Sequence, residues 1–269
     1  MTTLIVWVAV DGIGPSAAYI VSDSRITWGA GKQWDSGRKL FSSGSSPDLF
    51  GYSGEAFFPS QALSHALDLA DRSILWTADD APEVRHEALL QFLQAAYRRR
   101  HNAPEFDFSI VHVARGVGRE FKIWRIDYVA GEREWRNETI DMAPIAKHSN
   151  LLVALGSGAE KFMIDMRRWS GSAQGGTSRA VFGAFCDSLR AGRDPLSGGE
   201  PQIAGLTLQG PGQIVGFCTE RDAFLFGSPV GRSEALCVLE WRDATFQRID
   251  PRTLKLVDGA QRQVRPRMT

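Results

Sequence analysis

Apolar positions in the first 60 residues predict two hairpins. Residues 4–10 are apolar at consecutive positions and rich in β-branched side chains, which indicates a strand buried on both faces. After a glycine- and proline-containing turn at 11–16, residues 17–22 are expected to form its return partner. Segments 39–41 and 48–52 predict a second hairpin around a turn rich in serine.

Periodicity in the rest of the chain alternates between helix and strand. Helices are expected at 59–74, 82–100 and 177–191 and directly after Gly156-Ser157-Gly158, and strands at 107–114, 119–129, 134–139, 151–155 and within 202–241. Two packed sheets covered on each outer face by helices would account for this order, so we expect an α+β fold. No internal repeat or linker interrupts it, and the stretch from about residue 242 is polar and irregular. We therefore expect one domain over 1–241 and a C-terminal extension over 242–269.

Composition and charge exclude several classes of function. Lysine plus arginine and aspartate plus glutamate both number 31, so no net charge favours nucleic acid or an anionic membrane. No stretch approaches the roughly 20 apolar residues of a membrane span. The histidine spacing fits no metal hydrolase and there is no phosphate-binding loop, so we expect neither a metal nor a cofactor.

The cysteines and the start of the chain indicate a location. Cys186, Cys218 and Cys237 are widely spaced and predict neither a zinc site nor a disulfide framework. The chain also starts without the basic leader of a signal peptide. We therefore expect a cytoplasmic protein in a reducing compartment.

The second residue carries the first candidate chemistry. Thr2 follows Met1, and an aminopeptidase can remove a methionine before such a small residue. The freed α-amine, with a reference pKa of roughly 7.7–8.0, can act as general base for the hydroxyl of its own residue. This is nucleophilic catalysis by an N-terminal threonine.

Asp23 and Lys39 are a candidate ion pair near this terminus. Asp23 follows the predicted strand 17–22, and Lys39 opens the predicted strand 39–41. A partly buried pair would hold an ammonium close to Thr2, lower the pKa of its amine and stabilise an alkoxide. The alternative is a surface salt bridge worth about 0–1 kcal/mol.

Several short motifs, taken in order, resemble those of the proteasome β-subunit family of N-terminal threonine hydrolases, including its HslV-like bacterial members. They are Thr2 opening a strand, Asp23-Ser24-Arg25 closing the next, Lys39 before Leu40-Phe41, Ser53-Gly54, Gly156-Ser157-Gly158, and Asp194-Pro195-Leu196-Ser197-Gly198-Gly199. The spacing from Asp23 to Lys39 matches the family without a gap. The chain departs from the family in a longer first hairpin and in its greater length.

The resemblance implies a four-layer αββα sandwich of the N-terminal-nucleophile hydrolase type and a set of catalytic roles. Thr2 is nucleophile and base, Lys39 the cation that tunes both, Asp23 the anchor of Lys39, and the Gly54 N–H the oxyanion donor. Ser157, Asp194 and Ser197 form a hydrogen-bonded shell around the Thr2 amine, although Ser157 is equally well explained as a helix cap.

The same resemblance implies a substrate site. Thr27 pairs through its backbone with an extended substrate, and Ile26, Gly37, Tyr52 and Ala56 border the specificity pocket. The tryptophans, Trp7 and Trp28 among them, are expected in the core or at an interface.

The leading hypothesis is a proteasome-like threonine endopeptidase acting on peptides or unfolded proteins. The family implies a homo-oligomeric ring or spiral, and it admits an AAA+ ATPase partner. Two alternatives stay open at this point: an N-terminal-nucleophile amidase acting on a small amide, and a non-catalytic scaffold subunit with the same fold.

Overall fold

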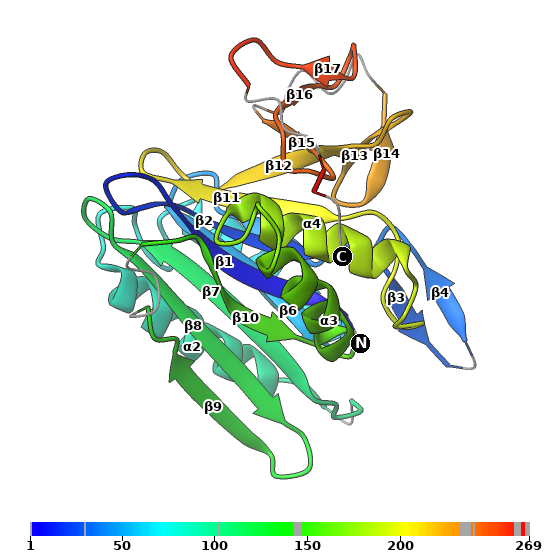
Figure 1. The fold of residues 1–269 in the computed structure, drawn as a ribbon. Coiled ribbons are helices and arrows are strands. Elements are labelled where there is room, and N and C mark those ends of the chain that lie inside the picture. Colours follow the sequence, from blue (N-terminus) through cyan, green and yellow to red (C-terminus); the bar gives the residue numbers. More distant parts are fainter. Residues whose placement is uncertain are drawn as a thin grey trace.

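The computed structural model describes residues 2–29, 31–101, 103–142, 147–231, 238, 240–260 and 265–266. Met1 and Cys237, on which two of the expectations above depend, lie outside the described residues. Figure 1 shows two sheets stacked face to face, with helices against them and the C-terminal segment at one end.

The first hairpin of the chain lies in the larger sheet. The strands of this sheet are β1 (Leu4–Val10), β2 (Pro15–Ser22), β10 (Asn150–Leu155), β11 (Gln202–Thr207), β12 (Gln213–Cys218), β13 (Ala223–Leu225), β14 (Ser228–Val230) and β15 (Trp241–Asp243). Their order is β10–β1–β2–β11–β12–β13–β14, and β15 pairs in parallel with β12. β1 and β2 are antiparallel, with Leu4 opposite Ser22, so the start of β1 lies beside the end of β2.

The second hairpin opens the smaller sheet. Its strands, in spatial order, are β5 (Leu40–Ser42), β6 (Asp48–Gly54), β7 (Phe108–Arg115), β8 (Phe121–Val129) and β9 (Glu134–Thr139). Two further hairpins are β3 (Ile26–Trp28) with β4 (Lys32–Trp34), and β16 (Ile249–Asp250) with β17 (Lys255–Leu256). In Figure 1 the β3–β4 hairpin projects at one end of the molecule.

The helices begin where local chemistry favours a helix start. They are α1 (Phe57–Ala70), α2 (Pro82–Arg98), α3 (Ala159–Ser170) and α4 (Ser178–Arg190). Pro82 opens α2, where its missing N–H leaves no hydrogen bond unmade. Thr177 caps α4 by accepting a hydrogen bond from the Ala180 N–H at 3.2 Å.

β1 explains how the sheets and helices pack. Alternate side chains of a strand point to opposite faces, so β1 contributes to two hydrophobic clusters. Ile5 and Trp7 pack with the apolar faces of α3 and α4. Leu4, Val6 and Val8 pack against the smaller sheet. The other face of the smaller sheet packs on α1 and α2.

The predicted α+β class and both early hairpins are confirmed, and β1 has the predicted bounds. The β3–β4 hairpin was not predicted. The stretch after residue 241 is less irregular than expected, because it holds β16 and β17 and inserts Phe246 between Trp7, Tyr19 and Phe182. The division of the chain at residue 241 stays a prediction.

In the part of the chain that the structure describes, each helix is too short or too polar to cross a membrane.

Candidate active site

The register of the first hairpin brings Asp23 to the start of β1. Asp23 follows the last residue of β2, and β2 runs antiparallel to β1. The Thr3 N–H donates to Asp23 Oδ1 at 3.0 Å, and the Asp23 N–H donates back to the Thr3 carbonyl at 3.2 Å. The carboxylate therefore lies next to the residue that follows Thr2.

Lys39 joins Asp23 to Thr2. It immediately precedes β5, and its Nζ donates to Asp23 Oδ1 at 2.8 Å and to Thr2 Oγ1 at 3.0 Å. Both members of the ion pair are buried, with Lys39 1% and Asp23 0% exposed. Burial lowers the pKa of the Lys39 ammonium, and the charge and hydrogen bond of Asp23 oppose this shift. The pair is therefore a buried one, unlike the surface salt bridge considered as the alternative.

Backbone donors hold the Asp23 carboxylate in place. Its Oδ2 accepts from the Gly198 N–H at 2.9 Å and from the Arg25 N–H at 3.1 Å. With the Thr3 N–H and Lys39 Nζ on the other oxygen, each carboxylate oxygen has two donors. A buried charge is tolerated when it is paired and hydrogen-bonded in this way.

Ser157, Asp194 and Ser197 form a second chain of hydrogen bonds. Asp194 Oδ2 accepts from the Ser157 and Ser197 hydroxyls, both at 2.7 Å. Ser197 Oγ in turn accepts from the Thr3 hydroxyl at 2.8 Å. Ser157 does not cap α3, because Gly158 occupies the N-cap position and no side chain caps it.

Gly156 allows this turn to approach the chain start. It has φ +87°, and a Cβ there would lie 2.0 Å from the Thr2 carbonyl oxygen. Two residues later, the Gly158 N–H donates to that same oxygen at 3.2 Å. Glycine is therefore needed at position 156 for this close backbone contact with Thr2.

A pocket of about 840 Å³ opens beside Thr2 and Lys39. Gly54 lines it at the end of β6, with φ +94°, a conformation that favours glycine. Most of the predicted substrate-site residues also line it: Ile26, Thr27, Tyr52 and Ala56. The prediction for Gly37 is not met: Gly37 is buried behind Ile26, where a Cβ would meet the Ile26 side chain at 2.3 Å, and it does not line the pocket.

Two residues of the site were missed from the sequence. Gln202, 1% exposed at the start of β11, accepts from the Lys39 N–H at 3.0 Å and donates to the Gly37 carbonyl at 2.6 Å. It thereby fixes the backbone that carries Lys39. Thr3 was missed as the link to Ser197. The available signal for Gln202 was a glutamine at the start of an otherwise apolar strand. The available signal for Thr3 was the repeated threonine at positions 2 and 3.

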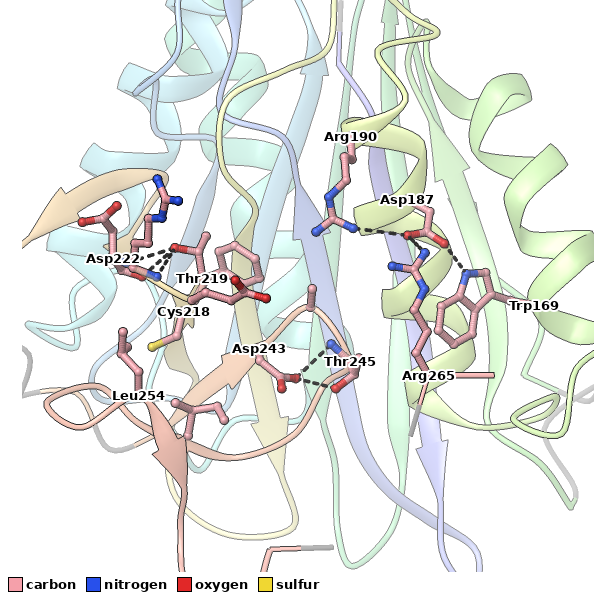
Figure 2. Close-up of a pocket in the computed structure, with 15 residues that line it drawn as sticks. Trp169, Asp187, Arg190, Cys218, Thr219, Asp222, Asp243, Thr245, Leu254 and Arg265 are labelled. Atoms are coloured by element: carbon pink, nitrogen blue, oxygen red, sulfur yellow. Dashed lines mark hydrogen bonds and ion pairs between the residues drawn. The ribbon is translucent and has the colours of Figure 1, made fainter. Parts of the chain in front are cut away.

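A second pocket, of about 680 Å³, shares no lining residue with the pocket beside Thr2 and contains none of the predicted site residues. Figure 2 shows Asp187 in its wall paired with Arg190 and Arg265, and Asp187 also accepts from Trp169 Nε1 at 2.9 Å. Cys218 at its wall and Cys186 on α4 are buried cysteines. Within the described ranges, no cluster of three or more histidine, cysteine or acidic side chains could hold a metal ion.

Comparisons with known proteins bear on the fold. Neither a family model nor a curated protein matches the sequence. Among solved structures, a Gly-1 mutant of Anbu from Hyphomicrobium sp. strain MC1 is 12% identical with a TM-score of 0.53, over 78% of this chain and 84% of that chain. Anbu from Yersinia bercovieri, described as an ancestral β-subunit, is 11% identical with a TM-score of 0.53, over 78% and 82%.

Eukaryotic HslV from Trypanosoma brucei is 15% identical with a TM-score of 0.49, over 76% of this chain and 99% of that chain. The inference of fold rests on the two Anbu structures, which are similar over most of both chains. The resemblance to the proteasome β-subunit family, first seen in the motifs, is thus confirmed at the level of the fold.

Proposed function

We propose that this chain is an N-terminal threonine hydrolase that cleaves peptide bonds with Thr2 as nucleophile after Met1 is removed. The observation that carries the proposal is Lys39 Nζ, buried and bonded to both Asp23 Oδ1 at 2.8 Å and Thr2 Oγ1 at 3.0 Å. A nucleophile in hydrogen-bond reach of a positioned partner, which a third group orients, is the general signature of covalent catalysis.

The first step forms an ester. The free α-amine of Thr2 takes the hydroxyl proton while Oγ1 attacks the carbonyl carbon of the scissile bond. The Lys39 ammonium stabilises the developing alkoxide, and Asp23 keeps Lys39 oriented and charged. As the tetrahedral intermediate collapses, the carbon–nitrogen bond breaks and the leaving amine receives the proton from the Thr2 amine.

The second step regenerates the enzyme. A water molecule gives a proton to the Thr2 amine and attacks the ester carbonyl, which releases the carboxylic acid and restores the Thr2 hydroxyl. In both steps the oxyanion is proposed to bind the Gly54 N–H, and loss of such a donor typically costs about 2.7–4 kcal/mol. Ser157, Asp194 and Ser197 are proposed to orient the chain start through Thr3.

The same proposal includes the arrangement of sheets and helices in four layers and the assembly of the protein. The hydrophobic clusters on both faces of both sheets support a four-layer αββα sandwich of the N-terminal-nucleophile hydrolase type. From the resemblance to the proteasome β-subunit family we propose a cytoplasmic homo-oligomer, in a ring or spiral, that acts on peptides or unfolded proteins and works with or without an AAA+ ATPase. Light scattering at micromolar concentration tests the assembly, and a monomer would argue against it.

Hydrolysis of a fluorogenic peptide tests the reaction. Wild-type protein should turn over, Thr2→Ser should retain activity because it keeps a hydroxyl beside a free amine, and Thr2→Ala should have none. Intact mass of the same samples should show that Met1 is absent. Full activity in a sample that retains Met1 would refute the mechanism.

A further inference from the structure

The exposed aromatic side chains of the described residues gather at one place. Four of them are at least half exposed: Trp28 at 50%, Trp34 at 53%, Phe57 at 77% and Phe106 at 58%. All four line the pocket beside Thr2, whereas the exposed large aliphatic side chains lie elsewhere. Exposed apolar groups concentrated in a hollow indicate a binding groove.

The β3–β4 hairpin presents an aromatic face to this groove. Ile26 is directly opposite Trp34 in the antiparallel register, and Trp28 lies two residues from Ile26. Opposed residues and residues two apart share one face of a hairpin, so Ile26, Trp28 and Trp34 lie on the same side. Phe57, at the start of α1, and Phe106 contribute to the same pocket from other parts of the chain.

Side chains outside this aromatic face anchor the hairpin. Arg25 binds Asp35 through two hydrogen bonds, of 2.7 and 2.8 Å. Arg25 Nη1 and Gln33 Nε2 both donate to the Pro195 carbonyl, at 3.2 and 3.3 Å. These bonds tie the hairpin to the loop that carries Asp194 and Ser197, so its aromatic face is held beside the site.

The charged side chains that line the pocket are already engaged by the protein. Lys39 pairs with Asp23, and Arg25 with Asp35. Glu55 accepts the N–H groups of Phe57 and Phe58 at the start of α1, at 2.6 and 2.8 Å, and Asp107 accepts the Ala130 N–H at 2.8 Å. Each charged group of the lining is therefore bonded within the protein, and the side chains of the lining that are exposed to a substrate are mainly aromatic.

We infer that the pocket selects extended peptide segments with a large aromatic or branched apolar side chain next to the cleaved bond. The inference rests on the proposed threonine hydrolase function and adds its substrate class. A cavity of about 840 Å³ is large enough to hold one such side chain and the adjacent residue of the substrate. Tryptophan and phenylalanine stack on rings and cover aliphatic chains, and they give no favourable partner to a carboxylate.

Peptidyl vinyl sulfones that differ only in the side chain next to the electrophile test the inference. The rate of covalent labelling is measured by intact mass for phenylalanine, leucine, alanine, aspartate and lysine probes. Phenylalanine and leucine probes should label at least about tenfold faster than the alanine probe, because added apolar groups in a fitted pocket give roughly 10–200-fold discrimination. Equal rates with all probes would overturn the inference and leave the proposed function intact, whereas no labelling by any probe counts against the proposed function.

Substitutions of the two tryptophans test whether the aromatic face gives the pocket its preference for apolar side chains. Trp28→Ala and Trp34→Ala should each bring the rate of the phenylalanine probe toward that of the alanine probe, whereas Trp28→Phe, which keeps an aromatic ring at that position, should retain the preference. Val117→Ala, at a 91% exposed position on the turn before β8, is the matched control and should change neither rate. If the tryptophan variants instead change the mass measured by light scattering while the probe preference persists, the aromatic face is a contact between copies of the chain and the inference is wrong.

Discussion

Among the residues that the structure describes, two clusters built on a fully buried carboxylate differ in their access to the pocket beside Thr2. The Lys39 cluster consists of Thr2, Asp23 and Lys39. The Asp48 cluster consists of Asp48, Arg85, His86 and His112. Each has a carboxylate that is 0% exposed and a cation within 3.0 Å of it. Burial of an ion pair is therefore not by itself a sign of catalysis.

The two clusters differ in the groups that accept hydrogen bonds from the cation. Arg85 Nε binds Asp48 at 3.0 Å, and its other nitrogens donate to the carbonyls of Asp80 and Arg115. These contacts connect α2 to the smaller sheet. Lys39, in contrast, directs one donor at the hydroxyl of Thr2, which lines the pocket. The arginine has a structural set of partners, whereas the lysine is bonded to a candidate nucleophile.

Histidines complete the Asp48 cluster. His112 Nε2 lies 3.0 Å from Asp48 Oδ1, and its Nδ1 lies 3.1 Å from Nδ1 of His86. Burial raises the pKa of Asp48, but the hydrogen bond and charge of His112 and the charge of Arg85 outweigh burial and hold that pKa below its ordinary value. Burial, with the neighbouring His112, lowers the pKa of His86 from 6.5 to about 3.

The largest expected effect is on stability, in the Asp48 cluster. Arg85→Met removes the cation and leaves Asp48 buried, which should lower the free energy of unfolding by about 3–5 kcal/mol. Urea unfolding measures the loss. Labelling of Thr2 in the folded fraction should be unchanged, because Arg85 does not contact the pocket. A loss below about 1 kcal/mol, or a slowed labelling step, would remove the contrast between the clusters.

In the Lys39 cluster, Lys39→Ala should affect the labelling rate and not the fold. Asp23 keeps three backbone donors in this variant, so the chain should fold, while single-turnover labelling should slow by about a hundredfold or more. Asp23→Asn should act in the same direction but more weakly. The double variant should be no slower than Lys39→Ala, since the pair acts as one unit. Strictly additive losses would show that the two residues act independently.

His86 should make the contribution of the Asp48 cluster to stability depend on pH. Folded His86 stays neutral down to about pH 3, whereas in the unfolded chain it binds a proton below about pH 6.5. The unfolded state therefore binds more protons in this window, and stability falls as the pH falls, by about 1.5 kcal/mol between pH 6.5 and pH 5. His86→Phe keeps the stacking on Trp124 and should lose this part of the dependence. An equal pH dependence of urea unfolding in wild-type protein and in His86→Phe would show that His86 is not the source of this dependence.

Gln202→Met should have the smallest effect. It removes the contacts that fix the backbone of Lys39, and a displacement of the ammonium by a fraction of an ångström should slow labelling by about tenfold. Gln213→Met, on the neighbouring strand β12, is the matched control and should label at the wild-type rate. If both variants behave alike, Gln202 has no positioning role.

Much of the site could be predicted because it depends on short, regular segments. The apolar run of β1 and its antiparallel return place Asp23 beside the chain start, and a fixed spacing from Asp23 leads to Lys39. Asp194 and Ser197 were predictable only through the family motif, because no local pattern shows that their loop meets residues 2 and 3.

The remaining features depend on contacts between distant segments. The β3–β4 hairpin has three-residue strands, too short for a hydrophobic period, so its exposed Trp28 and Trp34 were expected in the core or at an interface. Phe246 is a single aromatic residue in a polar stretch, and Gln202 a single polar residue in an apolar one. Only the assembled structure shows what each of them contacts.

The central claim is that Thr2 is the nucleophile and acts with a free amine. Peptide mapping by tandem mass spectrometry of wild-type protein labelled with a leucine vinyl sulfone tests this claim most directly. We expect one adduct, on an N-terminal peptide that begins at Thr2, and none in Thr2→Ala. An adduct on another residue such as Cys218, or labelled N-terminal peptide that still carries Met1, would contradict the account.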